Sequence, residues 1–150
     1  MNILLAIKPD YAAAILAGTK TVELRSYLPR NLHPGDTIYL VGKGRIWGHC
    51  TYAGATPAPP PGPCRDMWLE SIAAPAAMPS TAAHFLAQTP GRHTYAWHLR
   101  YPVTYGENGA PWHGGKISGF SYTAAEPGTK HPRLENYLLY LQTHTPPCKR

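Results

Sequence analysis

The stretch GTKTVELR, residues 18–25, follows directly after an alanine-rich segment and holds three charged side chains within six residues. These are Lys20, Glu23 and Arg25. Apolar residues, beginning with Val22, alternate with the last two charges, and this period of two predicts a half-buried strand with Glu23 and Arg25 on one face. Alpha carbons two residues apart in a strand are separated by roughly 6–7 Å, so the two charged side chains are expected to lie side by side.

The sequence before this strand predicts a strand and then a helix. NILLAIKP, residues 2–9, is a short apolar run that a proline ends, which is typical of a buried strand. In PDYAAAILAGT, residues 9–19, Pro9 or Asp10 can start a helix, and alanine and leucine continue it. Gly18 lies where a left-handed residue commonly ends a helix, so the chain is expected to turn sharply into the charged strand.

The sequence after the charged strand predicts further strands. Residues 29–36 form a turn rich in proline, and residues 37–44 and 45–55 are two strands whose GKG junction favours a tight hairpin. HTYAWHLRYPVTY, residues 93–105, has the aromatic and β-branched content of a late strand. Strands with interspersed helices predict an α+β fold.

The middle and the end of the chain are less regular. TPAPPPGP, residues 56–63, cannot pair inside a sheet and is expected to be a proline-rich surface loop or insertion. Short helices are expected at residues 64–74 and 80–90. The last part, about residues 106–150, is expected to be an irregular glycine-rich tail followed by a closing amphipathic helix over residues 131–144.

Length and charge limit the possible functions. A chain of 150 residues, 43% hydrophobic, suits one domain over residues 1–150. Lysine and arginine number 14 against 8 acidic residues, a formal net charge of +6, and such a basic domain attracts polyanions such as nucleic acid.

Cysteine, histidine and hydropathy patterns argue against several other classes. Three cysteines without a CxxC pair form neither a disulfide framework nor a cysteine-rich zinc site, and the eight histidines lack metal-ligand spacing, so we expect no metal and no cofactor. No apolar run approaches the roughly twenty residues of a membrane span. The start of the chain lacks the pattern of a secretory leader. We therefore expect a soluble, cytoplasmic protein.

GTKTVELR also reproduces the pattern G-x-K-x-x-E-x-R, which resembles the signature of the ASCH domain within the PUA-like superfamily. The neighbouring strand, helix and PGDTIYL segment agree with that family, and the resemblance covers residues 1–54 and, more weakly, 94–105. It implies a small PUA-like β-barrel with helices packed at its openings. It also implies a cleft beside the motif that binds RNA or a modified nucleotide.

The motif residues suit such a ligand. Arg25 can hold a phosphate or stack on a base, Lys20 can supply a point charge, and Glu23 can accept a hydrogen bond from a base amino group. Basic and aromatic residues elsewhere extend the prediction. The candidate nucleic-acid-binding residues are Lys8, Lys20, Glu23, Arg25, Tyr27, Lys43, Arg45 and Trp112. The alternative is a salt-bridged strand face with solvated turn lysines that bind nothing.

Two other functions remain open. Some relatives of this family are similar to amidohydrolases acting on acetylated cytidine, and some are ribonucleases; a small hydrolase would use Lys20 and Glu23 as catalytic residues. Lys20 matches the catalytic lysine of the amidohydrolases, but Glu23 stands where they have a threonine, and the match of their distant glutamate to Glu70 is unsupported. The third function is a protein-interaction domain that uses the proline-rich loop and the closing helix.

Overall fold

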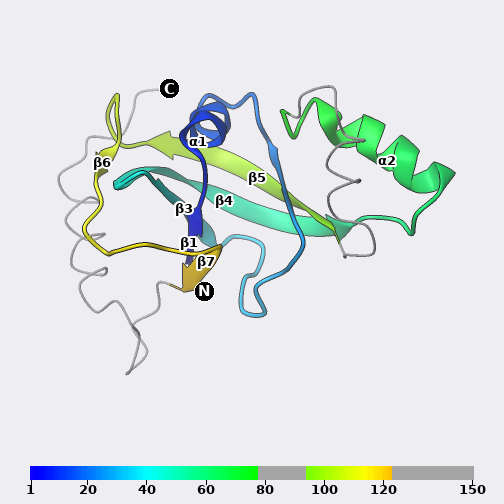
Figure 1. Cartoon of the computed structure of the whole chain (residues 1–150), viewed down its shortest axis with the longest axis horizontal. Helices are drawn as coiled ribbons and strands as arrows, with labels where there is room; N and C mark the ends of the chain where they lie inside the picture. The colour runs from blue at the N-terminus through cyan, green and yellow to red at the C-terminus, as the bar shows by residue number, and fades with distance from the viewer. Residues whose placement is uncertain (78–93, 123–150) are drawn as a thin grey trace.

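The computed structural model describes residues 1–77 and 94–122. Within these ranges the chain forms a curled, mixed sheet with two helices (Figure 1). The helices expected at residues 80–90 and 131–144 lie outside the described residues. The strands are β1 (Ile3–Ala6), β2 (Val22–Arg25), β3 (Thr37–Gly42), β4 (Arg45–Pro57), β5 (Tyr95–Thr104), β6 (Ala110–Pro111) and β7 (Phe120–Tyr122), and the helices are α1 (Pro9–Leu16) and α2 (Pro63–Ala73).

The sheet has the order β2-β5-β4-β3-β1-β7, and β6 pairs with β4. β1 and β3 are parallel, and the other pairs are antiparallel. The predicted hairpin between β3 and β4 is confirmed. Its two-residue loop, Lys43 and Gly44, has φ angles of 52° and 70°, as a type I′ turn requires.

The predicted first strand and helix are also confirmed. Pro9 begins α1, and Gly18, with φ of 80°, turns the chain out of the helix toward β2. β2 has four residues and is shorter than the charged run that predicted it. α2 confirms the helix predicted from about residue 64.

Two boundaries differ from the prediction. The proline-rich segment is shorter than the predicted loop, because β4 continues to Pro57 and α2 already begins at Pro63. Proline is compatible with both places, since a strand end and the first turn of a helix need no backbone N–H from it. The segment after residue 106 is not wholly irregular: β6 pairs with β4, and β7 pairs with β1. Strands of two and three residues are too short to show a period in the sequence.

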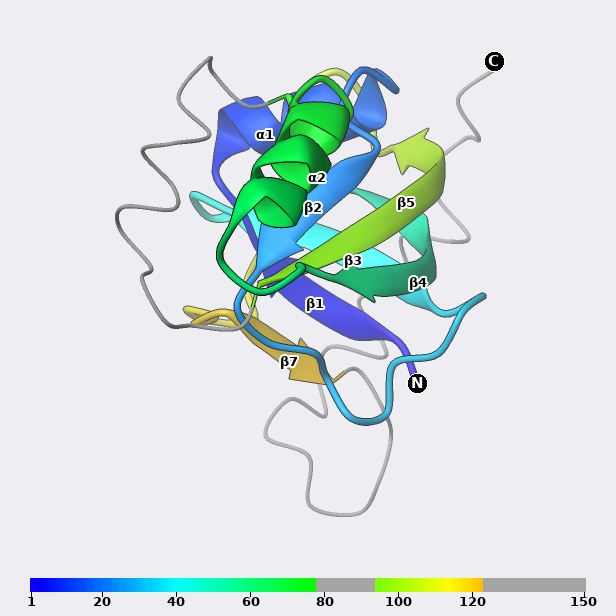
Figure 2. The same cartoon turned by 90° about the vertical axis from the view of Figure 1, so that its right-hand side faces the viewer.

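Both faces of the sheet are covered. The inner face, with α1 packed against it, forms the largest cluster, and the buried side chain of Trp97 lies there. α2 covers the outer face of β2 and β5 through Leu69 and Ile72 (Figure 2). A third cluster packs Trp112 and Tyr105 on the other face of β1 and β3. Val22 and Glu23 of β2 are consequently buried, whereas Leu24 and Arg25 are half-buried, so the start of the strand is more covered than the predicted half-buried strand.

β2 and β7 stand at the two ends of the strand order, and side chains bridge the gap between them. Arg25 Nη2 in β2 donates to the Ala6 carbonyl in β1, 3.0 Å away. The Tyr27 ring stacks on Phe120 of β7, with the centroids 5.3 Å apart. The curled sheet is thus a partly open barrel closed by side chains, and the expected small α+β barrel is confirmed. Of the helices expected at its openings, α2 packs on the outer face of β2 and β5.

Neither helix within residues 1–77 and 94–122 is long and apolar enough to cross a membrane.

Candidate functional site

A cleft of about 900 Å³ opens beside the N-terminal end of α1. Its walls come from the β1–α1 junction, the β3–β4 turn, the exposed part of β2 and the segment after β6. Gly42 is needed in one wall, because a Cβ atom there would lie 2.2 Å from the Ile7 carbonyl oxygen. The lining residues that carry charged or aromatic groups are Lys8, Tyr11, Glu23, Arg25, Lys43, Trp112, His113 and Lys116.

Glu23 is the carboxylate at the back of this cleft. It is largely buried, and each carboxylate oxygen accepts from a different cation: Oε1 from Arg25 Nε at 2.9 Å, and Oε2 from Lys20 Nζ at 3.2 Å. A buried carboxylate requires such partners, because removing one unpaired ion from water costs on the order of several kcal/mol of desolvation free energy. The motif strand therefore folds into a charged triad with a net charge of about +1.

Lys20 belongs to the triad but does not line the cleft. Only 5% of the residue is exposed, and its ammonium group donates to the Val22 and Ala76 carbonyls at 2.8 and 2.6 Å and forms the ion pair with Glu23. The two hydrogen bonds use two of the three N–H groups of the ammonium, and the ion pair neutralises its charge. Burial lowers the pKa of Lys20 below its usual value, and Glu23 opposes this shift. Lys20 thus acts here as a buried anchor for Glu23.

Arg25 lines the cleft and has hydrogen-bonding capacity left for a ligand. Its guanidinium donates to Glu23, to the Ala6 carbonyl and, at 3.4 Å, to the Tyr27 hydroxyl. A guanidinium has five N–H groups, so about two remain beyond these three bonds. Arg25 can donate hydrogen bonds and Glu23 can accept them, side by side, at the polar edge of a ligand.

The rim of the cleft is cationic. Lys8, Lys43 and Lys116 are exposed and line it. With Arg25, four cationic residues face one carboxylate, that of Glu23, among the described lining residues. Lys8 and Lys43 were predicted from the sequence, and the structure brings both to the cleft. Sequence reasoning missed Lys116, because nothing in its glycine-rich surroundings indicated a place beside β1.

The aromatic candidates are placed differently from one another. Trp112 lines the cleft but is only 8% exposed, and its Nε1 donates to the Gly115 carbonyl at 2.7 Å, so it forms wall and core rather than an open platform. Tyr27 packs between Trp97 and Phe120 and is absent from the cleft lining. Tyr11, which is not among the predicted site residues, lines the cleft and is 38% exposed.

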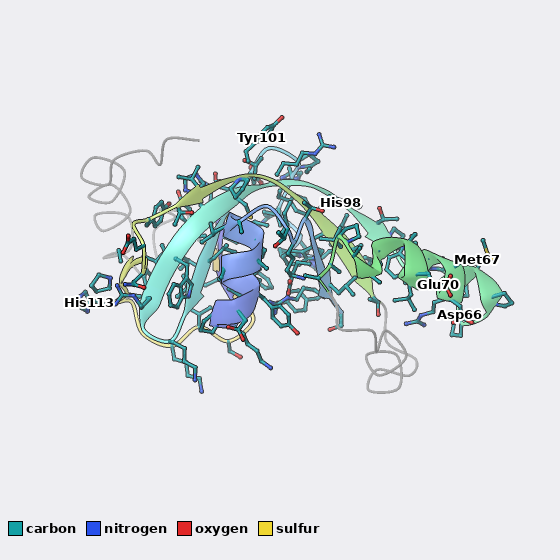
Figure 3. The ribbon with its side chains drawn as sticks, turned by 90° about the horizontal axis from the view of Figure 1, so that it is seen from above. Asp66, Met67, Glu70, His98, Tyr101 and His113 are labelled. Carbon is teal, nitrogen blue, oxygen red and sulfur yellow. The ribbon has the colours of Figure 1, made fainter. Side chains whose placement is uncertain are left out.

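Two further candidates lie away from the cleft. Arg45 donates through Nε and Nη2 to the carbonyls of Asn108 and Gly109, and it thereby holds the loop before β6. Glu70 is exposed on α2, in a different part of the molecule from His113 at the cleft (Figure 3). No group of three or more potential metal ligands occurs in the described part of the chain.

The chain matches no protein-family model and no curated protein sequence. Its fold resembles the crystal structure of the ASCH protein from Zymomonas mobilis, with a TM-score of 0.65, 15% sequence identity, and 93% of this chain and 94% of that chain covered. Two single-residue variants of that protein, one tyrosine-to-phenylalanine and one serine-to-alanine, give TM-scores of 0.60 and 14% identity. They cover 93% of this chain, and 97% and 95% of their own. The chain therefore has the fold of these ASCH proteins, and the resemblance indicated by GTKTVELR is confirmed at the level of the fold.

Proposed function

We propose that this chain is an ASCH-type domain that binds single-stranded RNA, or one exposed and modified nucleotide of an RNA, in the cleft beside Glu23 and Arg25. The observation that carries the proposal is the charge of the cleft, where four cationic side chains accompany one carboxylate. A cationic, concave site attracts phosphates. The ASCH fold and the chain's formal net charge of +6 support the same ligand class.

The size and chemistry of the cleft favour a nucleotide over an extended duplex. Its volume of about 900 Å³ is within the roughly 300–1,000 Å³ typical of small-molecule pockets. Lys8, Lys43 and Lys116 at the rim suit the phosphates, while Glu23 and Arg25 at the back suit the polar edge of a base. Tyr11 at the side supplies an exposed ring for stacking.

The test is a titration of labelled single-stranded RNA at several salt concentrations. We expect the logarithm of the affinity to fall linearly with the logarithm of the salt concentration, and the slope to decrease by about one in Lys43→Ala and in Lys116→Ala. Arg30→Ala is the matched control, because Arg30 is exposed and does not line the cleft. If no oligonucleotide binds at low salt, or if Arg30→Ala weakens binding as much as the cleft variants do, the proposal is wrong.

A second candidate function is hydrolysis of a modified nucleoside or of the RNA backbone by Lys20 and Glu23. The lowered pKa of Lys20 and its contact with Glu23 favour it. The two hydrogen bonds of Lys20 and its ion pair with Glu23 count against it, because a lysine must lose a proton and a partner before it can act as a base. Incubation with acetylated cytidine and with labelled RNA decides between the two functions: turnover must exceed that of Glu23→Gln to support hydrolysis.

A further inference from the structure

A second hollow, of about 320 Å³, lies at the C-terminal end of α1, whereas the cleft lies at the N-terminal end of the same helix. Its floor is apolar and includes Ile15 and Leu99. Arg100 and the largely buried Lys20 line it, and no carboxylate occurs among the lining residues that the structure describes. The exposed guanidinium of Arg100 therefore suits an anionic ligand, and the floor suits an apolar or aromatic group.

The rim of this hollow is built by a break in β5. Arg100 and Tyr101 are consecutive and both exposed, although neighbouring residues of a regular strand point to opposite faces. The register between β4 and β5 shifts between His49 and Thr51, opposite this point. Tyr101 has a φ of 51°, which is unfavourable for a non-glycine residue. This bulge presents an arginine and a tyrosine together, and Figure 3 shows Tyr101 projecting outward from β5.

The two hollows adjoin through the charged triad. Glu23 lines the cleft, Lys20 lines the second hollow, and their ion pair of 3.2 Å joins the two walls. On the outer side the Tyr11 ring of the cleft lies over the Lys20 ammonium, 5.2 Å from Nζ to the ring centroid. α1, which separates the openings, is eight residues and therefore about 12 Å long, so one strand of RNA can reach both.

We propose that the second hollow is a nucleotide subsite for the same RNA strand, in which Tyr101 stacks on a base and Arg100 holds the adjoining phosphate. This inference rests on the proposed function, since it places a further nucleotide of the ligand that the cleft binds. An arginine beside an exposed aromatic ring is the combination that single-stranded nucleic acid binding uses, because guanidinium groups bind phosphate and every base has a stacking face. Both residues are exposed and line the same hollow.

The test compares a mononucleotide with a single-stranded RNA of about ten nucleotides, a length in the range of single-strand sites, on wild type, Tyr101→Gly, Tyr101→Phe and Arg100→Ala. Glycine adopts a positive φ without steric cost, so Tyr101→Gly is expected to fold and to melt at or above the wild-type temperature. We expect Tyr101→Gly to weaken oligonucleotide binding by about 5- to 100-fold, the loss typical of one stacked base, and to leave mononucleotide binding unchanged. Tyr101→Phe retains the ring and the affinity.

Arg100→Ala is expected to weaken oligonucleotide binding and to lower its salt slope by about one, again without an effect on the mononucleotide. Arg30→Ala serves as the exposed control. If wild type binds the oligonucleotide and all the Tyr101 and Arg100 variants bind it equally well, the second subsite is refuted while the cleft proposal stands. If wild type binds no oligonucleotide at all, both proposals fail together.

Discussion

The Tyr11 ring lies over the Lys20 ammonium, 5.2 Å from Nζ to the ring centroid, so an exposed aromatic residue of the cleft rests on a buried cation. A cation positioned at a ring attracts it by roughly 0.5–2 kcal/mol, and this contact limits the orientations of the ring. Stacking on a ring that is already oriented loses less conformational entropy on binding.

We therefore expect Tyr11→Ala to weaken binding of single-stranded RNA by roughly 1–3 kcal/mol, and Tyr11→Phe to bind nearly as well as wild type. Fluorescence anisotropy at fixed salt measures both. Thermal melting of the two variants provides the control for folding. Equal affinities for Tyr11→Ala and wild type would show that no base stacks on this helix.

The triad predicts that the charged residues near the cleft divide into structural and binding residues. Lys20→Met leaves the carbonyls of Val22 and Ala76 without their donor and Glu23 with one cation fewer. Breaking a buried pair in this way costs about 3–5 kcal/mol, and urea unfolding should show that loss of stability.

Lys8→Met is the matched control for Lys20→Met. Lys8 is exposed at the cleft rim, so its replacement should change the free energy of unfolding by less than about 0.5 kcal/mol while it lowers the salt slope of RNA binding. The division is wrong if Lys20→Met unfolds at the wild-type urea concentration, or if Lys8→Met destabilises the fold as much.

The local structure around the motif was predictable because it depends on neighbouring residues. Pro9 and Gly18 mark the ends of the first helix region, and the GKG sequence suits a type I′ turn, so α1 and the β3–β4 hairpin follow from short-range preferences. The alternation in β2 also placed Glu23 and Arg25 on one face. The motif GTKTVELR resembles the ASCH signature, and this resemblance predicted the barrel.

The partners of those residues were not predictable, because they are distant in the sequence. Lys20 donates to the carbonyl of Ala76, 56 residues away, and no side-chain pattern indicates a backbone acceptor. Lys116 reaches the cleft because β7 pairs with β1, and a three-residue strand has no visible period. Tyr11 was missed because a tyrosine in an apolar helical segment suits the core as well as a cleft wall, and only the fold distinguishes the two.

Gly42 gives a prediction about how the cleft wall is built. A Cβ atom at this position would lie 2.2 Å from the Ile7 carbonyl oxygen, which is backbone and cannot rotate away. Gly42→Ala should therefore destabilise the protein by about 1–3 kcal/mol or more, as overpacking does, in a urea unfolding measurement.

Gly44 is the matched control in the same hairpin. It has a φ of 70° and open space around its Cβ position, so glycine is favoured there by the backbone conformation and not by a lack of space. Gly44→Asn should be nearly neutral, because asparagine tolerates the left-handed region, whereas Gly42→Asn should be as harmful as Gly42→Ala. A neutral Gly42→Asn would mean that β1 and β3 can separate without loss.

Cys50 predicts the response of the fold to alkaline pH. It is fully buried, and burial, with a smaller effect of the Glu23 charge, raises the pKa of its thiol from 9.0 to about 12. The folded state thus keeps a proton that the unfolded state releases above pH 9.

The stability from the Cys50 thiol is complete below pH 9, and it decreases as the pH rises from 9 toward 12, by at most about 1.4 kcal/mol per pH unit. Cys50→Ala should lose about 1 kcal/mol at pH 7 from reduced packing, but its stability should fall less steeply between pH 9 and 10, because the tyrosines affect both proteins alike. Urea unfolding of both proteins at pH 7, 9 and 10 measures the difference, and parallel losses in the two proteins would show that the Cys50 thiol ionises in the folded state as readily as in the unfolded chain.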